Sequence, residues 1–180
     1  MRQPLTPARV QAFLKELARS APDRGSYRVF VVGGGTAILL GWRPSTFDLD
    51  LYARDERVFR DIQGIKERLD INVEFARPED FVPPLSGSDD RHLFVERVGR
   101  VELYHYDPYA QLLSKVSRGF AQDLDDARRF VTSGMVDPER FRALVAAIPD
   151  KTFAKYPALS KSILLRSVER FLASLDGLTR

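Results

Sequence analysis

The spacing of hydrophobic positions changes along the chain, from a mixture of strand-like and helix-like patterns to a purely helical one. Apolar runs or strict alternation of apolar and polar residues, which are typical of β-strands, occur at 29–32, 48–51, 71–75, 92–97 and 100–106. Apolar residues at helical spacing occur at 6–19, 55–69, 108–119, 137–147 and 158–175. The pattern therefore predicts a sheet with helices, followed by helices alone.

The change of pattern falls at Asp107 and Pro108, where an aspartate that can cap a helix precedes a proline suited to the first helical position. We therefore expect a core over residues 1–107 and a helical region over 108–180 that packs on it. Within the core, the proline-containing segment 77–90 predicts a loop.

The strand predicted at 29–32 is followed at once by three glycines and then by an apolar helical face. The glycines are Gly33, Gly34 and Gly35. A strand, a glycine turn and a helix N-terminus in this order leave unpaired backbone N–H groups, which bind anions. The segment therefore predicts an anion site.

Two aspartates lie on the next predicted strand. Because side chains alternate along a strand, Asp48 and Asp50 emerge on one face while Leu49 and Leu51 point into a core. Neighbouring carboxylates repel each other unless a cation lies between them, and hard oxygen ligands suit Mg²⁺ or Mn²⁺. An anion site next to such a carboxylate pair is typical of enzymes that transfer phosphoryl or nucleotidyl groups.

The order of these residues resembles the signature of the nucleotidyltransferase superfamily. A pair of glycines followed by Asp48-Leu49-Asp50-Leu51 is similar to the motif of the polymerase β-like and minimal nucleotidyltransferases. The tetrapeptide Gly34-Gly35-Thr36-Ala37 with Arg43-Pro44-Ser45 more narrowly resembles the AbiEii-type toxins. The resemblance implies the nucleotidyltransferase fold, of the α/β (α+β) class, with a small mixed β-sheet flanked by helices and a C-terminal helical bundle.

The resemblance also implies a metal site and a nucleotide site. Asp48, Asp50 and a third carboxylate on a neighbouring strand would hold two Mg²⁺ (or Mn²⁺) ions. Glu74 is our choice for this third carboxylate, and Glu102 is the alternative. The implied nucleotide contacts come from Gly33, Gly34, Gly35, Thr36, Arg43, Ser45, Arg118 and Asp123. The predicted loop 77–90 would lie over or beside this site, with Phe81 and Val82 buried.

A lysine on the first C-terminal helix resembles part of a second AbiEii-type motif. Lys115 is followed by Arg118 and then by Asp123-Leu124-Asp125-Asp126. In the enzymes that it resembles, such a lysine reaches the nucleotide. Its charge would offset that of the leaving pyrophosphate, and Asp123 would orient it. The alternative interpretation is a solvated, charged helix face.

The predicted function is a metal-dependent nucleotidyltransferase that transfers NMP from an NTP to a hydroxyl acceptor, either an RNA or tRNA end or a protein. The AbiEii resemblance implies the toxin of a toxin–antitoxin or abortive-infection system, with a cognate antitoxin as partner. The alternative is a catalytically silent module that binds RNA or a partner protein. A dinucleotide-binding site is excluded because Ile38 stands where a third small residue belongs. A P-loop is excluded because no Gly-Lys-Ser/Thr occurs.

Composition adds little to this prediction. A net charge of +3 is too small to argue for a nucleic-acid partner. The absence of cysteine excludes disulfides and thiolate metal sites, and it agrees with a cytoplasmic location. The sequence contains no long uncharged apolar run, so we expect neither a membrane span nor a signal peptide. His92 and His105 do not suggest a zinc site, and we expect His105 to be packed among its tyrosine neighbours.

Overall fold

The computed structural model describes residues 3–176, which divide into two compact units. The first, which we call the sheet unit, comprises the chain up to Arg77 together with His92–Tyr106. The second, the helical unit, comprises Pro78–Arg91 and the chain from Asp107 onward. The segment predicted as a loop thus belongs with the helices. No helix among the described residues is both long and apolar enough to cross a membrane.

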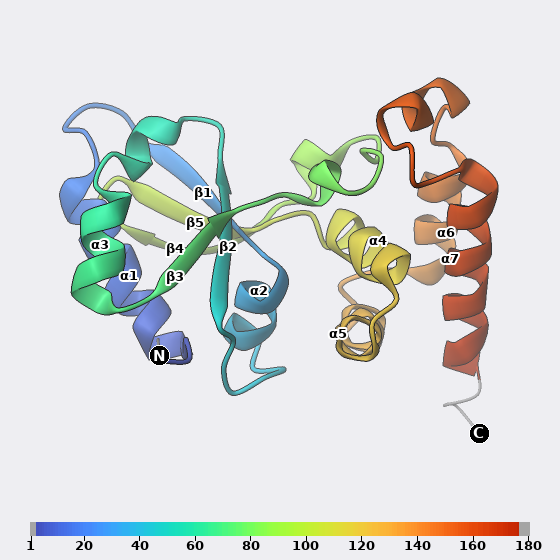
Figure 1. Ribbon diagram of the computed structural model, residues 1–180, viewed down its shortest axis with the longest axis horizontal. Coiled ribbons are helices and arrows are strands. Elements are labelled where there is room, and N and C mark those ends of the chain that lie inside the picture. The colour runs from blue at the N-terminus through green and yellow to red at the C-terminus, as the bar shows by residue number, and fades with distance from the viewer. Residues whose placement is uncertain (1–2, 177–180) are drawn as a thin grey trace. The chain divides into compact units, whose positions relative to one another are not determined.

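The sheet unit is built on a five-stranded mixed sheet with the order β3-β2-β1-β5-β4 (Figure 1). Its strands are β1 (Tyr27–Val32), β2 (Asp48–Ala53), β3 (Asn72–Phe75), β4 (Leu93–Val98) and β5 (Val101–His105). β1 is parallel to β5 and antiparallel to β2, while β2 is parallel to β3 and β4 is antiparallel to β5. The predicted mixed sheet flanked by helices is confirmed.

Three helices belong to the sheet unit: α1 (Pro7–Ser20), α2 (Gly33–Leu39) and α3 (Ile62–Leu69). The apolar residues at helical spacing in α1 are all buried, and they join alternate residues of β1 and β2 in one core; they are Val10, Phe13, Leu14 and Leu17. Leu49 and Leu51 contribute to that core from β2, as the alternation predicts. The opposite face of β2 is therefore left for polar side chains.

Three local predictions are wrong. The helix predicted at 55–69 is divided into a short 3-10 turn, η1 (Glu56–Phe59), and α3. Phe75 holds an apolar position of the alternating pattern at 71–75, which predicts that it faces the core, but it does not enter the core because β3 lies at the sheet edge. Its side chain is 58% exposed and packs against Phe59, with ring centroids 4.8 Å apart. Phe81 is 52% exposed, whereas Val82 is buried as expected.

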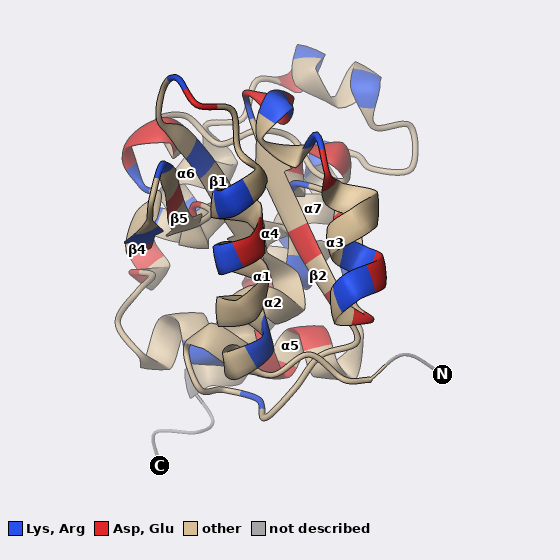
Figure 2. Ribbon diagram, turned by 90° about the vertical axis from the view of Figure 1, so that its left-hand side faces the viewer, with Lys and Arg blue, Asp and Glu red and all other residues tan. Residues whose placement is uncertain are grey.

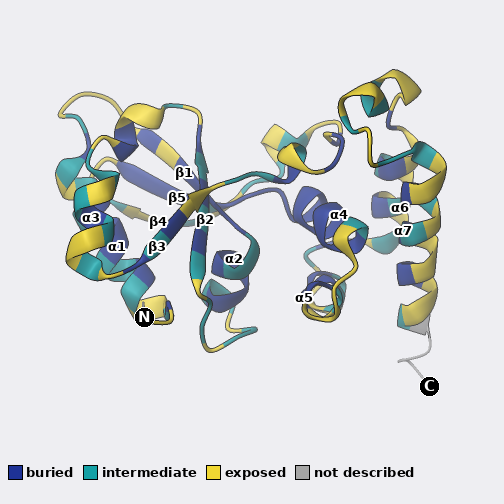
Figure 3. Cartoon of the chain, viewed as in Figure 1, coloured by how far each residue is buried: buried dark blue, intermediate teal, exposed yellow. Residues whose placement is uncertain are grey.

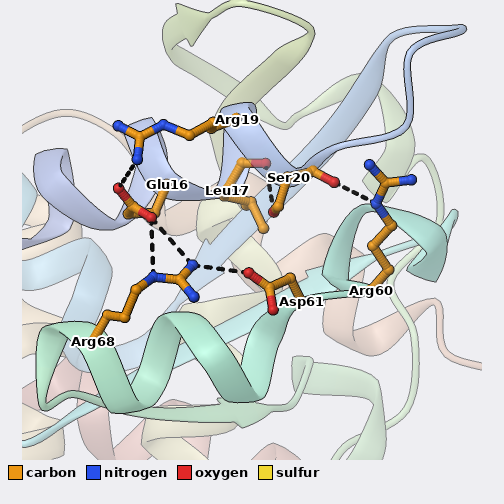
Figure 4. Close-up of polar contacts among 7 residues, drawn as sticks. All are labelled: Glu16, Leu17, Arg19, Ser20, Arg60, Asp61 and Arg68. Atoms are coloured by element: carbon orange, nitrogen blue, oxygen red, sulfur yellow. Dashed lines mark hydrogen bonds and ion pairs between the residues drawn. The ribbon is translucent and has the colours of Figure 1, made fainter.

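One ion pair connects α1 to α3 at the surface, and a second joins the two ends of α3 (Figure 4). Arg68 Nη2 lies 3.1 Å from Glu16 Oε2 and 2.8 Å from Asp61 Oδ2. Figure 2 shows that basic and acidic residues alternate along α3. Exposed pairs of this kind contribute about 0–1 kcal/mol each. The apolar core therefore supplies most of the stabilisation between these helices.

The helical unit contains α4 (Pro108–Arg118), α5 (Ala121–Thr132), α6 (Pro138–Ala146) and α7 (Lys161–Asp176). It also contains three 3-10 turns, η2 (Pro78–Asp80), η3 (Ser88–Asp90) and η4 (Asp150–Lys155). α4 packs against α5, α7 and η2, and most of its residues are buried (Figure 3). It is the central helix of this unit.

α4 begins as the sequence predicts, with Asp107 as its cap. Asp107 Oδ1 accepts a hydrogen bond from Tyr109 N at 2.9 Å, and Pro108 is the first helical residue. The Asp107 side chain is fully buried and also pairs with Arg91, whose Nη2 lies 2.7 Å from Asp107 Oδ2. The cap is therefore also one half of a buried ion pair.

Candidate functional site

The two aspartates of β2 point away from the core. Asp48 and Asp50 are partly exposed, while Leu49 and Leu51 between and after them are buried. This is the alternation that the sequence predicts. It arises because one face of β2 packs on the apolar core of the sheet unit and the other does not.

The parallel pairing of β2 with β3 brings a third carboxylate to the same face. Asp50 is the cross-strand neighbour of Glu74, and Asp48 is the neighbour of Asn72. Adjacent strands lie about 4.8 Å apart, so these side chains form one polar group. Asn72 Nδ2 donates to Asp48 Oδ1 at 2.6 Å and lies 3.4 Å from Glu74 Oε1. The alternating pattern at 71–75 puts Asn72 on the same face as Glu74, but the sequence gives Asn72 no role.

The alternative carboxylate, Glu102, lies elsewhere on the sheet. It is opposite Arg28 near the start of β1, whereas Asp50 is opposite Val32 at the end of that strand. Arg97 and Arg28 both pair with Glu102, and the Tyr104 hydroxyl donates to its Oε2 at 3.1 Å. Glu74, and not Glu102, is thus the neighbour of the aspartate pair.

The three glycines form the first turn of α2 and not a turn before it, because the helix begins at Gly33. A Cβ at Gly33, where φ is +60°, would lie 2.7 Å from Asp50 Oδ2. A Cβ at Gly34 would lie 2.4 Å from Thr46 Oγ1, and one at Gly35 would lie 2.5 Å from a methyl carbon of Val31. Glycine is therefore favoured at Gly33 by the positive φ, and at Gly34 and Gly35 by close packing. The start of α2 lies directly against the Asp50 carboxylate.

The hydroxyl of Thr36 is used inside the sheet unit. Thr36 is fully buried, and its Oγ1 donates to Val31 O at 3.1 Å and lies 3.3 Å from His105 Nδ1. This burial weighs against a direct phosphate contact by the hydroxyl. The contact of Thr36 with His105 depends on the pairing of β5 with β1, which the local sequence around the glycines does not reveal.

His105 is buried, as its predicted packing requires, and its side chain should make the protein less stable in acid. Burial lowers the pKa of His105 from 6.5 to about 4, so the imidazole is neutral at pH 7. The unfolded chain binds the proton at the ordinary pKa. The contribution of His105 to the free energy of unfolding is therefore complete above pH 6.5. It is lost as the pH falls towards 4, by up to about 3 kcal/mol.

Urea unfolding of the wild type and of His105→Gln, measured at intervals between pH 7 and pH 4, checks this prediction. Carboxylates contribute to acid sensitivity in both proteins, so the difference between their slopes isolates the imidazole. We expect the slope of the unfolding free energy against pH to be shallower in the variant. Identical slopes would contradict the prediction.

The segment between α2 and β2 carries two predicted nucleotide contacts. Arg43 and Ser45 are both partly exposed. The end of the segment is held by a backbone bridge in which Leu5 N donates to Thr46 O at 2.7 Å and Thr46 N donates to Leu5 O at 3.0 Å. The sequence gives no signal for Thr46, since only its position against Gly34 distinguishes it. The nucleotide contacts of Arg43 and Ser45 stay predictions.

Lys115 lies in the helical unit and is not on a solvated helix face, because it is only 3% exposed. Its Nζ lies 2.7 Å from Asp126 Oδ2 and 3.4 Å from Asp123 Oδ1. Arg118 Nη2 pairs with the same oxygen of Asp123 at 2.6 Å. Two cations and two carboxylates thus form one network joining α4 and α5. Whether Lys115, Arg118 or Asp123 contacts a nucleotide stays a prediction.

The carboxylates on β2 and β3 do not form a ready-made metal cage. Within residues 3–176, no three His, Cys, Asp or Glu side chains are arranged to hold a metal ion. The donor chemistry of Asp48, Asp50 and Glu74 nevertheless suits a hard cation, since all three supply carboxylate oxygens. Glu74 is exposed, so its rotamer is not held by packing.

Comparison with known proteins places the chain in a family. No curated protein and no solved structure matches it. A family model described as a nucleotidyltransferase of unknown function matches residues 8–162, a range that includes the glycines of α2, the carboxylates of β2 and β3, and α4. The chain therefore belongs to this family, the nucleotidyltransferases of unknown function designated DUF6036.

Proposed function

We propose that the protein transfers NMP from an NTP to a hydroxyl acceptor and that Asp48, Asp50 and Glu74 hold Mg²⁺ (or Mn²⁺) for this reaction. The observation that carries the proposal is the register of β2 and β3, which makes Asp50 and Glu74 direct neighbours with Asp48 on the same face. Family membership supports the same class of reaction. When bound, the metal would neutralise phosphate charge and acidify the acceptor hydroxyl.

The residues around the carboxylates have supporting roles in this proposal. Asn72 orients Asp48 through its 2.6 Å hydrogen bond. The backbone of the glycine turn grips the β- and γ-phosphates, and Gly33 keeps this backbone against Asp50. Arg43 and Ser45 contact the nucleotide or the acceptor. Because the hydroxyl of Thr36 is buried, we assign phosphate binding to the backbone of the glycine turn and not to this hydroxyl.

The proposal extends to the acceptor and the biological role, on the basis of the AbiEii resemblance. The acceptor would be an RNA or tRNA end or a protein, and the protein would be a cytoplasmic toxin neutralised by a cognate antitoxin. Lys115, Arg118 and Asp123 would serve the nucleotide as the resemblance implies. The competing proposal is a silent module that binds RNA or a partner protein. Its distinguishing property would be metal binding without transfer.

A labelling experiment tests the proposal. The full chain is incubated with Mg²⁺ and each α-labelled NTP, with and without total tRNA, beside an Asp48→Ala/Asp50→Ala variant. We expect label on an acceptor with the wild type and none with this variant, because loss of two carboxylates removes most of the charge that holds the metal. Label on tRNA would identify an RNA acceptor, and label on protein would indicate NMP transfer onto a side chain.

The matched control is Glu56→Ala/Glu67→Ala, which also removes two carboxylates from the sheet unit, at exposed positions away from the candidate site. We expect it to keep full activity. Thermal unfolding of both variants separates loss of activity from loss of fold. Bound Mg²⁺ with no label on tRNA, on protein or on the chain itself would favour the silent binding module.

A further inference from the structure

A cavity of about 410 Å³ lies within the helical unit, lined by residues of α4, α5 and α7 and by the residue that ends α4. Its charged lining residues are all arginines: Arg118, Arg128 and Arg170. Hydroxyl groups line it as well, from Ser117, Ser167 and Ser174. Ser174 Oγ already donates to Phe171 O at 2.6 Å, so the donors that this lining offers to an anion come from the three guanidinium groups and from Ser117 and Ser167.

The carboxylates near these arginines stand outside the cavity lining. Asp123 pairs with Arg118 at 2.6 Å and Asp125 pairs with Arg128 at 2.8 Å, yet neither aspartate lines the cavity. A guanidinium has five N–H donors, and these pairs occupy only some of them. Among the described residues, Arg170 has no acidic partner. Asp123 and Asp125 offset part of the charge of Arg118 and Arg128, so the positive charge that the cavity presents comes mainly from Arg170.

The remaining wall of the cavity is apolar. Phe171 and Val116 are buried, and Leu124 completes this side. Arginine forks bind phosphate with two parallel hydrogen bonds, and an aromatic side chain packs against a planar organic group. The volume lies in the range of small-molecule sites. Inorganic phosphate alone would leave most of this space and the apolar wall unused.

We propose that this cavity is a binding site for a small organic phosphate, of the size of a nucleoside monophosphate. Its phosphate lies among Arg118, Arg128 and Arg170, and its organic group lies against Phe171. The proposal shares Arg118 with the proposed nucleotide contacts, but it does not depend on nucleotidyl transfer, because none of the carboxylates of β2 and β3 lines the cavity.

Calorimetric titration of the metal-free full chain tests the proposal, with AMP, inorganic phosphate and adenosine as probes. We expect AMP to bind more tightly than either fragment, since only AMP engages both the arginines and the apolar wall. Arg128→Ala/Arg170→Ala should weaken AMP binding at least about tenfold, because charge-assisted hydrogen bonds are lost. Arg170→Gln alone should weaken it in the same direction without breaking any ion pair among the described residues.

The control is Arg129→Ala/Arg166→Ala, which removes the same charge from exposed positions on the same two helices, outside the cavity lining. It should bind AMP as the wild type does, and so should Asp48→Ala/Asp50→Ala. No AMP binding at millimolar concentration would overturn the proposal. Equal loss in the control pair, or loss in the carboxylate variant, would also overturn it, since binding would then reflect general charge or the other site. Failure of the labelling experiment leaves these outcomes unchanged.

Discussion

An Asp50→Asn variant is expected to lose nucleotidyl transfer by at least about a thousandfold while its free energy of unfolding changes by less than about 1 kcal/mol. Asparagine keeps the shape that packs against Gly33, so the start of α2 is preserved. It removes the negative charge that would hold a divalent cation between Asp50 and Glu74. The two quantities are measured by steady-state labelling and by urea unfolding of the same preparations.

The same assay decides between the two candidates for the third carboxylate. Glu74→Gln should reduce transfer strongly and leave stability nearly unchanged, because Glu74 is exposed and next to Asp50. Glu102→Gln should behave in the opposite way. Its carboxylate is buried and pairs with Arg28 and Arg97, so its loss should lower the free energy of unfolding and leave transfer by the folded protein nearly unchanged. Full activity in Glu74→Gln would remove Glu74 from the proposed metal site.

Replacing Asp107 by alanine is expected to destabilise the protein by about 3–5 kcal/mol. The substitution leaves the guanidinium of Arg91, whose side chain is only 10% exposed, without its carboxylate partner. It also removes the cap that accepts from Tyr109 N, at the start of the central helix of the helical unit. Urea or thermal unfolding at pH 7 measures the loss.

Asp137→Ala is the matched control for this effect. Asp137 also caps a helix, accepting from Arg140 N at 2.7 Å, and is also followed by a proline. It is exposed and has no buried arginine partner among the described residues, so its loss should cost only the cap, about 1 kcal/mol. An equal loss of unfolding free energy in the two variants would show that the buried pair with Arg91 does not stabilise the protein.

Features that depend on local periodicity and on helix ends were predictable from the sequence. The alternation in β2 predicts that Asp48 and Asp50 share one face, and the structure bears this out. Asp107 caps α4 as its residue type and the following proline predict. Such features are decided within a few residues of chain, where side-chain spacing and backbone hydrogen bonding leave few alternatives.

Contacts between distant segments were decided only by the tertiary structure. The pairing of β2 with β3 makes Glu74 the neighbour of Asp50. The pairing of β5 with β1 brings Arg28 to Glu102, and its pairing with β4 brings Arg97 to the same carboxylate. The packing of α4, α5 and α7 encloses Lys115 and gathers three arginines around a cavity.

The sequence by itself thus determined which side chains share a strand face and where α4 begins. The tertiary structure decided which carboxylates, hydroxyls and arginines are neighbours. The physical reason is that strand register and helix packing follow from burial of the whole apolar surface, to which each polar residue contributes little. The local pattern around a polar residue therefore cannot reveal the partners that the rest of the fold brings to it.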